Sequence, residues 1–103
     1  MDWYWTWEGK CFGYRDGEEL RTHDGKHVGR FYDEEIYDCN GNYLGEVKDG
    51  DRLITDTRKK NKRKYSFAPR MDRMSRMERM DRMGRMMRMG HEDFPAPAYF
   101  DNY

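Results

Sequence analysis

A short pattern recurs three times in the chain at a constant spacing of 16 residues. It spans residues 7–13, 23–29 and 39–45, and each copy has glycine at its third and seventh positions. The first glycines are Gly9, Gly25 and Gly41, and the second are Gly13, Gly29 and Gly45. A repeat of this kind predicts a structure built from similar units that pack on one another.

The first glycine of each copy indicates a β-hairpin turn. Asp-Gly or Asn-Gly between β-rich segments is the strongest short signal for a hairpin. A two-residue loop would pair Leu20 with Gly29 and Ile36 with Gly45. A three-residue loop with a glycine bulge pairs apolar residues directly, namely Tyr4 with Phe12, Leu20 with Val28, and Ile36 with Leu44. Because register follows the apolar pattern, we expect the three-residue loop.

The second glycine of each copy has no such role in a turn. We interpret it as a position where the backbone or an apolar side chain of a neighbouring repeat comes close. A fourth copy begins at Leu53 but lacks the glycine, and the basic residues 58–64 stand where its turn and return strand would be. Since a single hairpin is marginally stable in water, the copies are expected to pack together.

These patterns predict an all-β fold of consecutive hairpins, three clear and one degraded, around a pseudo-symmetric core. Residues 1–67 would form this domain and residues 68–90 a low-complexity basic tail. Residues 91–103 would be an extended segment, because Pro95 and Pro97 prevent a helix from continuing there.

An apolar residue, Asp/Asn-Gly-Lys, an aliphatic residue and a second glycine recur about four times near a 16-residue period over residues 3–67. This arrangement resembles the small bacterial domains called 4-fold β-flower proteins. The resemblance implies hairpins arranged around a pseudo-fourfold axis. The family has no catalytic motif or established activity that could be transferred to this chain.

The composition indicates a small core in a protein without membrane contacts. Hydrophobic residues make up 36% of the chain, against about 45–50% in ordinary globular proteins. No signal peptide and no apolar run of about 18 residues is visible, so we expect a cytoplasmic protein. The two cysteines lie 28 positions apart and are expected to be free thiols.

The charges are segregated along the chain although their sum is zero. Residues 1–57 carry a net charge of −7, residues 58–90 one of +10, and residues 91–103 one of −3. One interpretation is self-neutralisation, in which the basic arm lies on its own domain. The other is an arm that binds an anionic partner such as a nucleic acid through phosphates. The residues for that contact would be Lys59, Lys60, Lys62, Arg63 and Lys64.

Three tryptophans alternate along the first expected strand, so their indoles share one face. We favour a role for this face as a cover for the hairpin stack or as an oligomer contact. The alternative is a platform on which bases stack, with Trp5 and Trp7 as its residues.

A second alternative concerns four side chains that flank equivalent turns, Cys11, His23, His27 and Cys39. Two thiolates and two imidazoles could bind zinc, but their spacing matches no zinc-finger pattern. Ordinary turn-flanking side chains are the simpler interpretation.

From Arg70 the triplet Arg-Met-x runs seven times. Arginine and methionine favour helices, but a three-residue period spirals around a helix of 3.6 residues per turn and gives it no apolar face. We therefore expect a frayed helix or disorder.

The sequence has no catalytic constellation. We expect a non-enzymatic structural or interaction module without a cofactor, whose partner is an unknown protein or a second copy of the chain. Weak sequence-independent binding of nucleic acid and a Cys/His metal site are the two alternatives.

Overall fold

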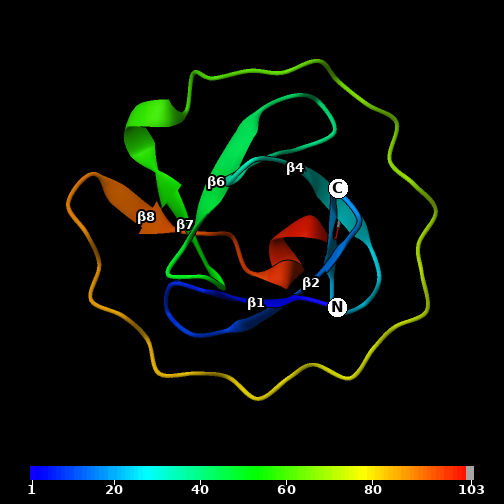
Figure 1. Ribbon diagram of the computed structural model, residues 1–103, viewed down its shortest axis with the longest axis horizontal. Helices are drawn as coiled ribbons and strands as arrows, with labels where there is room; N and C mark the ends of the chain where they lie inside the picture. Colours follow the sequence, from blue (N-terminus) through cyan, green and yellow to red (C-terminus); the bar gives the residue numbers. More distant parts are fainter. Residues whose placement is uncertain (102–103) are drawn as a thin grey trace.

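The strands of the structure follow the chain in order around a closed barrel (Figure 1). The computed structural model describes residues 1–101. The barrel strands are β1 (Trp3–Thr6), β2 (Cys11–Asp16), β3 (Glu19–Thr22), β4 (His27–Tyr32), β5 (Glu35–Tyr37), β6 (Tyr43–Lys48) and β7 (Arg52–Asp56). Each pairs with the next in antiparallel fashion, and β7 closes the barrel by pairing with β1 in parallel. An odd number of alternating strands leaves the first and last running in the same direction, so the closing pair is parallel. The predicted fold class is confirmed.

The loop length of the repeat is as predicted, but the strand register is not. Around the second turn, the Thr22 N–H donates to the Lys26 carbonyl at 3.0 Å, which leaves a three-residue loop. A second irregularity then shifts the register between Leu20 and Arg21, and Leu20 faces Gly29 instead of Val28. The same shift pairs Tyr4 with Gly13 and Ile36 with Gly45. Direct apolar pairing is therefore wrong, because each large side chain lies opposite a glycine.

The second glycines lie where neighbouring parts of the chain approach closely. A Cβ atom added at Gly13 would overlap the carbonyl oxygen of Arg21 in the next hairpin. At Gly29 it would lie 2.9 Å from Cγ2 of Ile36, and at Gly45 it would lie 2.6 Å from the ring of Phe94. Each glycine therefore makes room for a neighbour that a larger residue would displace.

The fourth hairpin is completed by a strand from the far end of the sequence. Strand β8 (His91–Asp93) pairs antiparallel with β7, and Ile54 faces Asp93. The return strand therefore does not come from residues 58–67, where the sequence pattern places it. The predicted C-terminal segment therefore contributes a strand to the sheet of the predicted hairpin domain.

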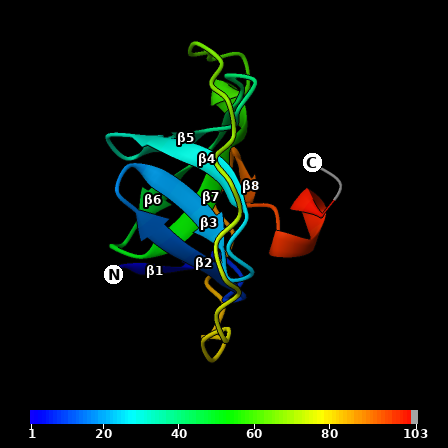
Figure 2. The ribbon, with the colours of Figure 1, turned by 90° about the vertical axis from the view of Figure 1, so that its right-hand side faces the viewer.

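The core closes with two aromatic rings from the C-terminal segment. The Phe12 ring packs edge-on against Phe94 at 5.2 Å and against Phe100 at 5.8 Å, and all three are buried. Phe100 ends the short 3-10 helix η2 (Pro97–Phe100), which lies across one end of the barrel in Figures 1 and 2. The expectation of an extended segment is thus wrong for these four residues, because Pro97 occupies the first turn, where no N–H is required. Residues 102–103 lie outside the described part.

Between β7 and β8 the chain makes one complete circuit around the barrel, as Figures 1 and 2 show. We call this segment, residues 57–90, the belt. It begins with the 3-10 helix η1 (Thr57–Lys59), and the rest of it has no helix. The circuit closes where the Thr57 N–H and hydroxyl donate to the Gly90 carbonyl at 2.9 and 2.8 Å. The expected frayed helix or disorder is therefore replaced by an ordered extended segment.

The role of the C-terminal segment in the core leads to a mutational prediction. Phe100→Ala should lower the free energy of unfolding by about 3–5 kcal/mol, because it leaves a cavity beside Phe12. Tyr99→Ala is the matched control, since the Tyr99 side chain is 61% exposed and its loss should cost less than about 1 kcal/mol. Urea unfolding followed by circular dichroism measures both. Similar losses in the two variants would contradict the assignment of Phe100 to the core.

Candidate functional site

The belt contacts the barrel through its main chain at every third residue. N–H groups of Lys64, Arg73 and Arg82 donate to the carbonyls of Gly41, Gly25 and Gly9 at 2.9, 2.9 and 2.8 Å. Those of Phe67, Arg76 and Arg85 donate to Cys39, His23 and Trp7 at 2.9, 2.7 and 3.0 Å. Each step of 16 residues in the barrel therefore corresponds to a step of nine residues in the belt, taken in the opposite direction.

The turn glycines are also the points of closest approach. A Cβ atom added at Gly9, Gly25 or Gly41 would overlap the carbonyl oxygen of Arg82, Arg73 or Lys64, respectively. Glycine at these turns therefore meets two demands, since Gly25 also has a positive φ of 88°. The belt lies so near the turns that no side chain fits between them.

The Arg-Met-x period explains why the belt is extended. An extended chain with three residues per turn, such as polyproline II, returns every third residue to the same side. The arginine N–H groups then face the barrel turns in sequence, and the methionine side chains face outward. A helix would turn the arginines in all directions and leave most of the turn carbonyls without a donor from the belt.

Arginine side chains of the belt cover the aromatic residues of the first hairpin. The Arg79 guanidinium lies 4.6 Å from the ring centroid of Trp3, that of Arg82 lies 3.6 Å from Trp5, and that of Arg88 lies 5.2 Å from Trp7. Such contacts contribute about 0.5–1 kcal/mol at exposed sites and ~2 kcal/mol when desolvated. The tryptophan face therefore fastens the belt to the barrel.

Trp5 and Trp7 have no free face on which a base could stack. Their exposed fractions are 7% and 2%. Their indole N–H groups donate to the carbonyls of Met80 and Met86, both at 2.9 Å. The structure thus places the predicted stacking platform beneath the belt of the same chain.

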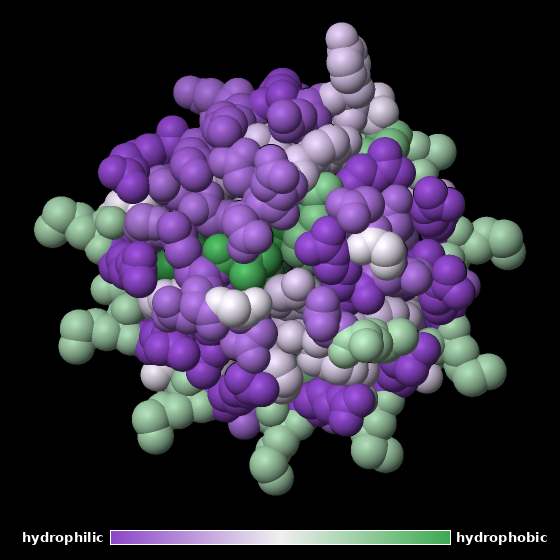
Figure 3. All heavy atoms as spheres, viewed as in Figure 1, coloured by the Kyte–Doolittle hydropathy of each residue, from purple (hydrophilic) through white to green (hydrophobic). Residues whose placement is uncertain are grey.

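The outer side of the belt carries an arc of methionine side chains. Figure 3 shows apolar side chains projecting from the sides and the lower part of the rim of the molecule. Their exposed fractions are 88–99%, and we call them the methionine crown: Met71, Met74, Met77, Met80, Met83, Met86 and Met89. The Arg-Met-x triplets are visible in the sequence but do not by themselves indicate a site. Their three-residue period was the signal, and it could be interpreted only once the ring of turns was known.

The charges of the belt are largely compensated by the barrel. Arg73 and Arg82 pair with Asp16 and Asp51 at 2.6 Å each, and Arg85 pairs with Asp49 at 3.4 Å. These acidic residues lie in or beside turns at the other ends of the strands. Of the two interpretations of the charge segregation, self-neutralisation by an arm lying on its own domain is the one that the structure shows.

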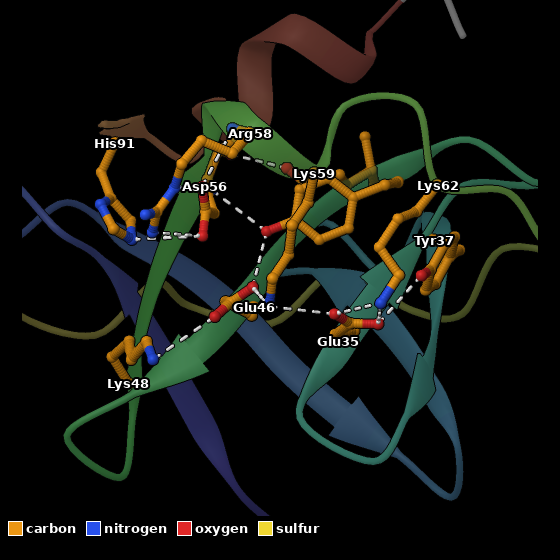
Figure 4. Close-up of polar contacts among 12 residues, drawn as sticks. Glu35, Tyr37, Glu46, Lys48, Asp56, Arg58, Lys59, Lys62 and His91 are labelled. Atoms are coloured by element: carbon orange, nitrogen blue, oxygen red, sulfur yellow. Dashed lines mark hydrogen bonds and ion pairs between the residues drawn. The ribbon is translucent and has the colours of Figure 1, made fainter.

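The basic residues 59–64, considered for nucleic acid, also make contacts within the chain, and Figure 4 shows those of Lys59 and Lys62. Lys59 pairs with Glu35 and Glu46 at 3.1 and 2.9 Å, and Lys62 pairs with Glu35 at 3.0 Å. Lys60 pairs with Glu92 at 2.6 Å, the Lys64 ammonium lies 5.3 Å from the Tyr32 ring, and Arg63 forms a β-bridge with Asn42. A phosphate would have to compete with these contacts.

The pKa values of the residues in Figure 4 are shifted in the direction that favours these ion pairs. Burial alone would raise the pKa values of Glu35 and Glu46, but hydrogen bonds from the lysines and tyrosines outweigh burial and lower both. The hydrogen bond to Glu46 raises the pKa of Lys59. Burial, together with the Glu35 carboxylate, raises the pKa of Tyr37 to about 12. The carboxylates and ammonium groups therefore remain charged and paired around neutral pH.

The four Cys/His side chains considered for zinc lie in separate environments. Cys11 is buried and its sulfur accepts the Arg79 N–H at 3.2 Å, and burial raises the pKa of this thiol. Cys39 is half-buried, and His23 lies beside Asp24 and Glu78. Within residues 1–101, no three His, Cys, Asp or Glu side chains are grouped as metal ligands.

His27 is held between an acidic residue and the belt. Its Nε2 lies 2.7 Å from a Glu19 carboxylate oxygen, and its Nδ1 accepts the Arg70 main-chain N–H at 2.9 Å. Nδ1 can accept only when it carries no proton, so this geometry requires neutral imidazole. Burial lowers the pKa of His27, although the Glu19 carboxylate opposes this effect.

An open cleft of about 800 Å³ lies beside this cluster, between the belt and the two links that join the second hairpin to its neighbours, at residues 16–19 and 30–33. Its lining includes four basic and four acidic side chains. Arg30 and Arg70 pair with Glu19, and Arg73 pairs with Asp16. The cleft thus offers neither an anion nor a cation a set of uncompensated partners.

Comparisons with known proteins identify no relative. No protein-family model matches the chain, and neither a curated protein nor a solved structure matches it. Among the described residues, no helix is long and apolar enough to span a membrane.

Two glycines with the same backbone conformation test whether the belt rests on the turns. Gly25 and Gly50 have φ values of 88° and 87°, but only at Gly25 would an added Cβ contact the belt. Both alanine variants should carry about 1–2 kcal/mol of strain. Gly25→Ala should lose at least ~1 kcal/mol more in urea unfolding, because it also displaces hydrogen-bonded belt residues. Equal losses would mean that the belt does not rest on this turn.

The His27 cluster predicts an acid-sensitive stability. The folded pKa of His27 is lowered from 6.5, so the unfolded chain binds its proton more readily. The stability contributed by neutral His27 should therefore be complete above about pH 6.5 and decline towards about pH 5. His27→Gln should be less stable, but its free energy of unfolding should vary less over this range. A wild-type profile that is flat from about pH 8 to 5 would refute the prediction.

Proposed function

We propose that the protein is a non-enzymatic interaction module whose contact surface is the methionine crown. The observation that carries this proposal is that all nine methionines are exposed, whereas methionine is ordinarily among the buried residue types. Large exposed apolar patches on soluble proteins commonly mark interaction sites. A compact all-β barrel is compatible with such a module.

The belt is well suited to presenting this surface. Its main chain is held at every third residue by the turns, so little backbone freedom remains to be lost on binding. The methionine side chains themselves stay flexible and can adapt to a partner of irregular shape. A rigid backbone with flexible apolar side chains can bind a partner whose surface is not closely complementary in shape.

The partner that we propose is a second copy of the chain. The formal net charge is +0, so no net charge keeps copies apart. The crown is convex, however, and two rims can bring only a few methionines together. Burying each side chain contributes about 1.5–3 kcal/mol, against about 4–15 kcal/mol for lost freedom on association. Pairwise contacts should therefore be weak, and several contacts around one rim should reinforce each other.

The repeat supports membership of the β-flower family, and the composition supports a cytoplasmic protein without enzymatic activity. Nucleic-acid binding and metal binding receive no support from the contacts described above, because Lys59, Lys60 and Lys62 pair with carboxylates of the chain and Trp5 and Trp7 lie beneath the belt.

Sedimentation velocity tests the self-association. Across about 10 μM to 1 mM protein, the weight-average sedimentation coefficient of the wild type should rise. A variant with Met74, Met77, Met80 and Met83 changed to Gln should remain monomeric over this range, because it lacks the apolar contact. Tyr65→Gln removes an apolar side chain that is 95% exposed but lies outside the crown, and it should behave as the wild type. A wild type that stays monomeric, or a crown variant that associates equally, would overturn the proposal.

A further inference from the structure

We propose that the methionine crown is a site of reversible oxidation by a two-electron oxidant such as hydrogen peroxide. The crown side chains are 88–99% exposed, and among the described residues no hydrogen bond involves their sulfur atoms. Reaction of methionine with peroxides requires access to the thioether sulfur, and here seven such groups are held in solvent around one rim.

The chemistry transfers one oxygen atom to each sulfur. The thioether sulfur attacks one peroxide oxygen, the O–O bond breaks, and the other oxygen leaves as water after a proton shift. The sulfur loses two electrons to the peroxide and becomes a sulfoxide. Methionine sulfoxide reductases return the sulfoxide to the thioether with two electrons from a thiol reductant, and the oxygen leaves as water, so the modification can act as a switch.

The fold is arranged so that this oxidation leaves it intact. Sulfoxide formation commonly damages proteins because it places a polar group in an apolar core. Here the core consists of aromatic and aliphatic residues and contains no methionine. The belt is fastened by main-chain hydrogen bonds and by arginine side chains, and the methionines contribute only carbonyl oxygens to these contacts. Oxidation of the crown therefore changes the surface and not the scaffold.

The thiols are less available to the oxidant than the crown is. Cys11 is fully buried, and its sulfur accepts the Arg79 N–H. Cys39 is half-buried. Peptide mapping can therefore separate oxidation of the crown from oxidation of either cysteine.

The consequence depends on the proposed self-association. A sulfoxide is polar, so oxidation converts the apolar crown into a polar rim and removes the gain from burying it. Oxidised protein should be monomeric at concentrations at which reduced protein associates. The crown would thereby make association sensitive to the redox state of the surroundings.

The first experiment measures the oxidation itself on the full chain. Hydrogen peroxide should add one oxygen to each crown methionine, at rates within about threefold of N-acetylmethionine amide. The thermal midpoint of the oxidised protein should change by less than about 2 °C, because no core or belt contact is lost. Crown rates more than about tenfold below that of the free amide, or loss of the β-type circular dichroism, would overturn the inference.

The second experiment measures sedimentation of the oxidised protein before and after treatment with methionine sulfoxide reductases. Association should be absent after oxidation and return after reduction. If oxidised protein still associates, the redox control is refuted. If untreated protein does not associate, the proposed self-association and its redox control both fail, while the assignment of the oxidation site is decided by the first experiment.

Discussion

The structure depends on a match between two periods, 16 residues in the barrel and nine in the belt. Each hairpin turn presents main-chain carbonyls at one end of the barrel, and nine belt residues reach from one turn to the next, as three Arg-Met-x triplets between Arg73 and Arg82. From Lys64 to Arg85, the N–H of every third belt residue thus meets an acceptor on the barrel. Both periods are needed, because a belt with another spacing would move out of register after a single turn.

This match also determines how the barrel is completed. The belt leaves from β7, makes its circuit and returns to β7 as β8, so the two strands of the last hairpin are separated by the whole circuit. The segment that follows supplies Phe94 and Phe100 to the core beside Phe12. A circuit of such length costs loop-closure entropy of about 3 kcal/mol on a flexible-chain estimate, which the turn contacts and the arginine–tryptophan contacts offset.

The same geometry directs the arginine and methionine side chains of the belt to opposite sides. Arginines approach the barrel, where they cover tryptophan rings and pair with carboxylates in the opposite turns. The methionines have no position on the barrel side and extend into solvent. Charges that are segregated in sequence are thereby mixed in space, and the remaining unusual feature of the surface is apolar and rich in sulfur. The proposed interaction surface and its proposed oxidation therefore involve the same residues.

Several features could be predicted from the sequence because they depend on local chemistry. The repeated glycines and Asp/Asn-Gly turns indicate hairpins because turn formation depends on the local residues. The 16-residue period shows how many similar units the chain contains. The separation of acidic and basic segments likewise predicts that the arm can lie on its own domain.

Other features were decided only by tertiary structure. The register of Leu20 opposite Gly29 follows from an irregularity that lets the next hairpin approach, and no pattern within one hairpin reveals this. The helix propensity of the arginines and methionines is overridden by a ring of acceptors that exists only after the barrel has formed. The tryptophans were recognisable from sequence as a shared face, but their cover lies more than 70 residues away along the chain. The sequence by itself determined the repeating unit, and the tertiary structure decided which segment encircles it. The reason is that the three-residue period of the belt selects an extended chain only when the folded barrel places acceptors at matching distances.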